Sequence, residues 1–90
     1  MAETFFLEVA TPERMMVHEA VSSAQIPAAN GYIGVLPGHA ALLSELGEGE
    51  LSYVVEGHRH KLNIRGGWME ISGERTRVLA DTAEVPDHEP

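Results

Sequence analysis

Apolar residues occur along this chain in short runs, and nearly every run ends at a turn-forming residue. Several runs alternate apolar and polar positions, as at Leu62/Ile64 and Met69/Ile71, and this alternation predicts β-strands with one buried face. Runs spaced by about 8–12 residues are typical of antiparallel hairpins in β-sandwiches and barrels. The predicted strands are Phe5–Val9, Met15–His18, Ser23–Ile26, Tyr32–Val35, Leu51–Glu56, Arg59–Ile64, Trp68–Ile71 and Thr76–Ala80.

The turn residues between these strands have recognisable forms. Gly57-His58 and Gly73-Glu74 place glycine first, which is typical of two-residue type II′ hairpin turns. Pro27 is predicted to end the strand before it, because proline cannot donate to a β-ladder. The window Ala40–Leu46 is too short to decide between a helical turn and a strand.

Gly66 and Gly67 interrupt the strand pattern just before the sole tryptophan, Trp68. Two glycines within a strand indicate a bulge, a bend or the close approach of another backbone. We favour a corner of the sandwich over a contact with a partner. Trp68 is most simply a core residue, although an exposed tryptophan beside such a bend would be an anchor for a protein partner.

Composition narrows the range of functions. Ninety residues are enough for one domain. The formal net charge of −8, with only six basic residues, argues against nucleic acid and anionic lipid as partners. The absence of cysteine excludes disulfides and thiolate metal sites. No apolar run approaches the roughly 18–20 residues of a membrane span, so we predict no direct membrane insertion. The expected partner is therefore another protein.

Five histidines raise the alternative of a metal-dependent enzyme. His58 and His60 are two residues apart, as in the His-x-His pair of a small cupin-like jelly-roll. In this chain, however, His39 precedes the pair, and no carboxylate follows at the required offset. No serine lies in a nucleophile elbow, and Gly47-Glu48-Gly49 lacks the context of a cofactor loop. We assign no catalytic, cofactor-binding or metal-binding residue and predict no cofactor.

Four segments, in order along the chain, point to a family. Gly31–Ala40 closely resembles the Gly-x-hydrophobic-Gly-hydrophobic-x-Pro-Gly-His-Ala signature of the epsilon subunit of F-type ATP synthases. The other three segments are Leu7–Pro12, Gly66–Ile71 and Val78–Glu84. Together they cover nearly the whole chain.

The resemblance implies a flattened antiparallel β-sandwich of about 8–10 short strands in residues 1–84, followed by a polar, flexible tail in residues 85–90. It also implies a subunit of the central-stalk rotor that docks on the gamma subunit and the c-ring. Such a subunit helps to couple proton-driven rotation to ATP synthesis and catalyses no reaction by itself. Its expected location is peripheral, at the cytoplasmic face of the inner membrane.

Two sets of contact residues follow from the resemblance. Gly31 and Tyr32 match the loop that faces the c-ring, and Thr11, His39 and Ser44 match positions on the side that faces gamma. Tyr32 stands where an acidic residue is common, so its expected contact is aromatic rather than ionic.

Family members usually continue into a two-helix hairpin, which can bind ATP in some bacteria and can inhibit hydrolysis. This chain ends at Pro90, either as a naturally short form or as a piece of a longer one. For the chain as given we predict no nucleotide binding and no inhibition by such a hairpin. A generic sandwich adaptor for some other partner is the remaining alternative, and co-purification with gamma separates the two.

Overall fold

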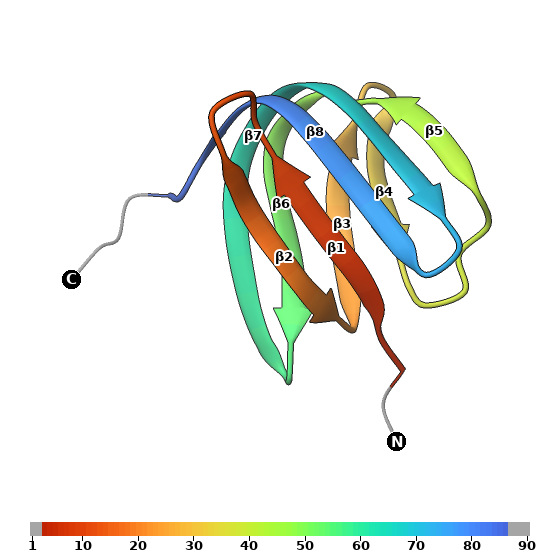
Figure 1. The fold of residues 1–90 in the computed structure, drawn as a ribbon. Coiled ribbons are helices and arrows are strands. Elements are labelled where there is room, and N and C mark those ends of the chain that lie inside the picture. Colours follow the sequence, from red (N-terminus) through yellow and green to blue (C-terminus); the bar gives the residue numbers. More distant parts are fainter. Residues whose placement is uncertain (1–2, 87–90) are drawn as a thin grey trace.

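The computed structural model describes residues 3–86, which form eight β-strands and contain no helix (Figure 1). The all-β prediction is therefore confirmed. No segment of residues 3–86 provides a helix that could cross a membrane. The strands are β1 (Phe5–Ala10), β2 (Met15–Val21), β3 (Ser23–Ala28), β4 (Gly31–Val35), β5 (Leu42–Glu45), β6 (Glu48–Val55), β7 (His58–Ser72) and β8 (Arg75–Glu84).

All eight strands belong to one sheet that folds over on itself. Its order is β2-β1-β8-β7-β6-β3-β4, and β5 pairs with β7. Figure 1 shows β1, β2 and β8 in front of β3, β4 and β6. One ladder departs from the antiparallel pattern, because β1 and β8 run parallel. A parallel pair needs a long connection, and here almost the whole chain lies between the two strands.

The longest strand, β7, connects the two layers. Its first half pairs with β6 and its second half with β5, in a continuous register. Gly66 and Gly67 lie between the halves and both have positive φ, at 66° and 109°. A Cβ on Gly67 would overlap the carbonyl oxygen of Leu79. The predicted corner is therefore confirmed, but the two strands predicted on either side of it form one bent strand.

The core lies between the two layers and consists of the inward-facing residues of the alternating strands. Leu7, Ile26, Leu51, Met69 and Val78 are almost completely buried. Leu62 and Ile64, and likewise Met69 and Ile71, point inward as their alternation predicts. Burying such side chains is the main stabilising contribution in a domain of this size.

Three local predictions are settled by the structure. β3 continues through Pro27 to Ala28, so the prediction that the strand stops at Pro27 was wrong. The turn between β6 and β7 consists of Glu56 and Gly57, with φ of 50° and 83°, which is the type I′ pattern. The prediction of a type II′ turn at Gly57-His58 was therefore wrong. The undecided window at Ala40–Leu46 contains the strand β5.

The predicted boundary between the domain (residues 1–84) and the tail (residues 85–90) stays a prediction. β8 ends at Glu84, and Val85 and Pro86 follow outside any strand. The rest of the predicted tail, residues 87–90, lies outside the described residues.

Candidate protein-docking surface

An exposed apolar row crosses the outer face of the front layer. Met15, Ala10, Leu79 and Trp68 are direct neighbours on four adjacent strands, from β2 through β1 and β8 to β7. Met15, Leu79 and Trp68 are each about half exposed, at 52%, 51% and 52%. We call these four residues the apolar row. A contiguous set of exposed apolar side chains is typical of a protein-interaction surface.

Trp68 lies in this row because successive side chains of β7 point to opposite faces of the sheet. Met69 and Ile71 point into the core, so Trp68 and Glu70 point to solvent. The prediction of Trp68 as a core residue was therefore wrong, and the alternative of an exposed tryptophan holds. The signal was present in the sequence, because the alternation that buries Met69 also places Trp68 on the opposite face.

A shallow hollow of about 360 Å³ lies beside Trp68 and Leu79. Thr11 lies on its rim, in the loop between β1 and β2. The backbone N–H of Thr11 donates to the Arg14 carbonyl oxygen over 2.9 Å, and the Thr11 hydroxyl accepts from the Arg14 N–H over 3.3 Å. These bonds close the loop, so Thr11 shapes the edge of the hollow.

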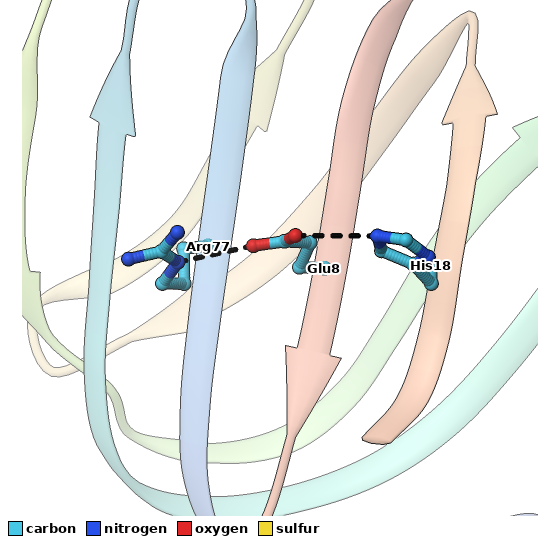
Figure 2. A network of polar contacts seen from close by, with 3 residues as sticks. All are labelled: Glu8, His18 and Arg77. Carbon is cyan, nitrogen blue, oxygen red and sulfur yellow. Dashed lines mark hydrogen bonds and ion pairs between the residues drawn. The ribbon is translucent and has the colours of Figure 1, made fainter.

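A polar network lies next to the apolar row on the same face. Figure 2 shows its three residues. The Glu8 carboxylate accepts from Arg77 Nε over 3.0 Å and lies 3.4 Å from His18 Nε2. The hydrogen bond from Arg77 is the main cause that lowers the pKa of Glu8, and it outweighs the desolvation of this carboxylate. The His18 ring also meets Phe6 edge-on, with centroids 4.5 Å apart. These contacts join β2, β1 and β8 side by side.

The other two residues predicted to face gamma lie farther along the chain. Ser44 is in β5 and pairs with the buried Met69, so its side chain lies on the face of the sheet opposite Trp68. Its hydroxyl donates to the Glu45 carbonyl oxygen over 3.0 Å. His39 lies in the loop between β4 and β5, where Nδ1 is 2.7 Å from the Ala40 carbonyl oxygen. The structure thus places Thr11 beside Trp68, whereas the Ser44 side chain lies on the opposite face of the sheet. Within the described residues His39 makes no hydrogen bond with either Thr11 or Ser44.

The residues predicted to face the c-ring begin β4. Gly31 is the first residue of the strand, and Tyr32 is 57% exposed. The Tyr32 hydroxyl accepts a hydrogen bond from the Glu50 backbone N–H over 2.9 Å. Its ring reaches β6 over Gly49, where a Cβ would lie 2.6 Å from that hydroxyl. Tyr32 is therefore an exposed aromatic side chain held in one position.

The histidines of the β6–β7 hairpin have local partners. His60 stacks on Tyr53, with centroids 5.2 Å apart, and His58 Nδ1 lies 3.2 Å from the Glu56 carbonyl oxygen. Burial, followed by the charge of Glu19, raises the pKa of the Tyr53 hydroxyl. Across residues 3–86 no three metal-ligating side chains gather in one place.

A small sheet folded over an apolar core, with an exposed apolar row on its outer face, has the features of a protein-interaction domain. Residues 4–86 match the family model of the ATP synthase Delta/Epsilon chain, beta-sandwich domain, and the chain belongs to this family.

Among its relatives is the "ATP synthase epsilon chain" of Solibacter usitatus, 54% identical over 84 residues, which cover 93% of this chain and 63% of the relative. The protein of the same name from Koribacter versatilis is 41% identical over 87 residues, which cover 97% of this chain and 61% of the relative. The chain therefore spans less than two thirds of the length of these relatives.

Two solved structures share the fold. One is a chain of the mitochondrial ATP synthase of Euglena gracilis, with a TM-score of 0.84 and 22% identity over 91% of this chain and 53% of that one. The other belongs to the central stalk and c-ring of the Tetrahymena thermophila enzyme, with a TM-score of 0.75 and 14% identity over 90% of this chain and 66% of that one. At these identities the likeness concerns the fold alone.

Proposed function

We propose that this chain is the β-sandwich of an ATP synthase epsilon subunit, a part of the central-stalk rotor. In this function it docks on the gamma subunit and on the c-ring, and it helps to couple proton-driven rotation to ATP synthesis. It catalyses no reaction by itself. Membership in the Delta/Epsilon chain family and relatives named ATP synthase epsilon chain, at up to 54% identity, support the proposal.

The observation that carries the proposal is the exposed apolar row beside Thr11, one of the predicted gamma-facing residues. Trp68 is half exposed on an acidic domain, and Thr11 lies on the rim of the hollow beside it. Tryptophan is the residue most often found at the centre of a protein interface, because it buries a large area with few rotatable bonds. We therefore place the gamma contact on the outer face of β8, β7 and β5.

The c-ring contact belongs to the beginning of β4 in this proposal. Gly31 and Tyr32 lie at the turn after β3, and the hydrogen bond to Glu50 holds the tyrosine ring in place. A preorganised ring loses little conformational entropy on binding. The proposed docking site is thus a fixed aromatic ring beside the exposed Glu50.

The architecture suits a part that transmits torque. β7 pairs with β8 along one side and with both β5 and β6 along the other, so it joins the two layers by backbone hydrogen bonds. Such a domain has no hinge between its layers. In the proposed assembly it lies peripherally at the cytoplasmic face of the inner membrane, as part of the ATP synthase complex.

Co-purification tests the proposal. The affinity-tagged chain is expressed together with the gamma and c subunits of the same organism, and the complexes are recovered in mild detergent, with the tag alone as control. We expect gamma and the c-ring to be retained with the chain. Recovery of the folded chain without gamma would contradict the proposed function.

A further inference from the structure

One carboxylate lies in the hollow beside Trp68. The hollow is lined by the apolar row and by the loop between β1 and β2, and of its described lining residues Asp81 alone carries a charge. Asp81 lies two positions after Leu79 on β8 and shares its outer face, whereas Ala80 between them is buried. The hollow therefore combines an apolar wall with a single negative charge.

Gly66 leaves room for this carboxylate. A Cβ on Gly66 would lie 2.5 Å from Asp81 Oδ2, so the carboxylate occupies space that a side chain at position 66 would take up. Asp81 is exposed, and within residues 3–86 it forms no ion pair. Its charge is therefore free to meet a charge on a partner.

The other charges near Trp68 favour a cation in the hollow. Glu45 pairs with Trp68 from the β5 side and is exposed, and among the described residues it forms no ion pair either. The Arg77 guanidinium, on the same strand as Asp81, is held by Glu8 over 3.0 Å. The net charge of −8 adds to the negative potential. An acidic side chain is repelled from such a site, and a basic one is attracted.

A lysine or arginine side chain matches both parts of the hollow. Its methylene stem packs along Trp68 and Leu79 while its charged head reaches Asp81, and a cation over an indole ring gains a further attraction. A volume of about 360 Å³ is at the small end of the range for ligand pockets, which suits one inserted side chain.

We propose that the hollow lined by Trp68 and Asp81 receives a basic side chain of the gamma subunit. This inference rests on the proposed function, because the hollow is continuous with the apolar row on the face assigned there to gamma. It adds the chemistry of the gamma residue that this face recognises.

Asp81→Asn tests the inference, because it removes the charge and keeps the shape of the side chain. Glu74→Gln is the matched control, since it removes one negative charge from the exposed turn between β7 and β8, beside a different hollow. We expect Asp81→Asn to raise the dissociation constant for purified gamma at least about fivefold, because the basic head loses its partner. Glu74→Gln should change it less than about twofold. Titration calorimetry measures both variants.

The outcomes separate the two proposals. A wild-type chain that does not bind gamma would overturn the proposed function and this inference together. A wild-type chain that binds gamma, with Asp81→Asn binding equally well, would overturn the inference alone. Tighter binding by Asp81→Asn would show that the hollow takes an apolar side chain, and equal weakening by both variants would show that only the overall charge matters. Both results contradict the inference.

Ionic strength provides a second measurement that needs only the wild-type chain, in case Asp81→Asn does not fold. Salt screens an attraction between charges at a shallow surface, whereas it does not weaken apolar packing. We expect the dissociation constant for gamma to rise at least about threefold between about 0.05 M and about 0.5 M sodium chloride. An unchanged or lower dissociation constant at high salt would contradict the inference.

Discussion

At the scale of single residues, Gly67 shows most directly how the sequence determines the fold. Its φ of 109° is unfavourable for a residue with a side chain, and a Cβ would overlap the Leu79 carbonyl oxygen. The clash is with backbone, which cannot move aside without breaking the β7–β8 ladder. Gly67 therefore allows the sharp bend that brings the two layers together.

We expect Gly67→Ala to lower the free energy of unfolding by more than about 3 kcal/mol, or to prevent folding altogether. Gly57→Ala is the matched control, because Gly57 also has a positive φ but open space around it. Gly57→Ala should lower the free energy of unfolding by about 1–2 kcal/mol. Urea denaturation measures both variants, and equal losses would show that the backbone contact at the bend is unimportant.

Glu8 makes the stability of the domain depend on pH. The hydrogen bond from Arg77 lowers the pKa of Glu8 below its ordinary value of 4.5. As pH falls, the unfolded chain therefore takes up this proton before the folded chain does. The stabilisation from Glu8 is complete above the ordinary pKa and is lost as pH falls through the lowered one.

We expect Glu8→Gln to reduce the drop in Tm between about pH 7 and about pH 3, since it removes this proton uptake. Glu13→Gln is the control. It removes the same charge from an exposed position for which the described residues show no ion pair. The same pH dependence of Tm in both variants would contradict a special contribution from Glu8.

At the scale of elements, the β6–β7 hairpin is not optimal. Its type I′ turn requires positive φ at both central residues, yet the first is Glu56, at 50°. A glutamate in this region is strained, whereas asparagine adopts it more readily. The hairpin therefore forms because its strands pair over eight positions, despite the turn residue.

We expect Glu56→Asn to raise the free energy of unfolding by about 0.5–1 kcal/mol. Glu74→Asn is the control, because Glu74 is the second residue of the β7–β8 turn and is not among the non-glycine residues with positive φ. Both substitutions remove one negative charge. An equal effect of the two in urea denaturation would mean that charge, and not turn geometry, is responsible.

Alternation and turn residues predicted most strands of this fold, because both act over short stretches of chain. They could not predict that β7 runs unbroken through Gly66 and Gly67, since the ladder that holds it is formed by β8, β6 and β5. The continuation of β3 through Pro27 also depends on how its neighbouring strands pair. The missing N–H lies on the side away from β4, where the ladder with β6 does not extend beyond Gln25.

The candidate surface was only partly predictable. The resemblance named Thr11, which lies beside this surface, and Ser44, which lies on the opposite face of the sheet, and whether either contacts gamma stays a prediction. Trp68 was expected in the core, and Leu79 and Met15 were not singled out. Their alignment depends on the parallel pairing of β1 with β8, between residues about 70 positions apart in sequence. No local pattern contains such a pairing, so the apolar row becomes visible only in the folded chain.

At the scale of the whole molecule, the two proposed binding surfaces lie on different parts of a stiff domain. The apolar row occupies the outer face of the front layer, and Tyr32 begins β4 in the rear layer. Because β7 joins the layers, a force applied at one surface reaches the other without a hinge. This arrangement is what the proposed rotor subunit needs between gamma and the c-ring.

The most direct test of this account is the affinity of the chain for purified gamma, measured by titration calorimetry with wild type, Trp68→Ala and the control Val85→Ala. Val85 is 70% exposed and lies outside the apolar row. We predict that Trp68→Ala raises the dissociation constant at least about tenfold, that Val85→Ala leaves it within about threefold, and that both variants stay folded. Binding of Trp68→Ala as tight as that of the wild type would contradict the central claim that this face docks on gamma.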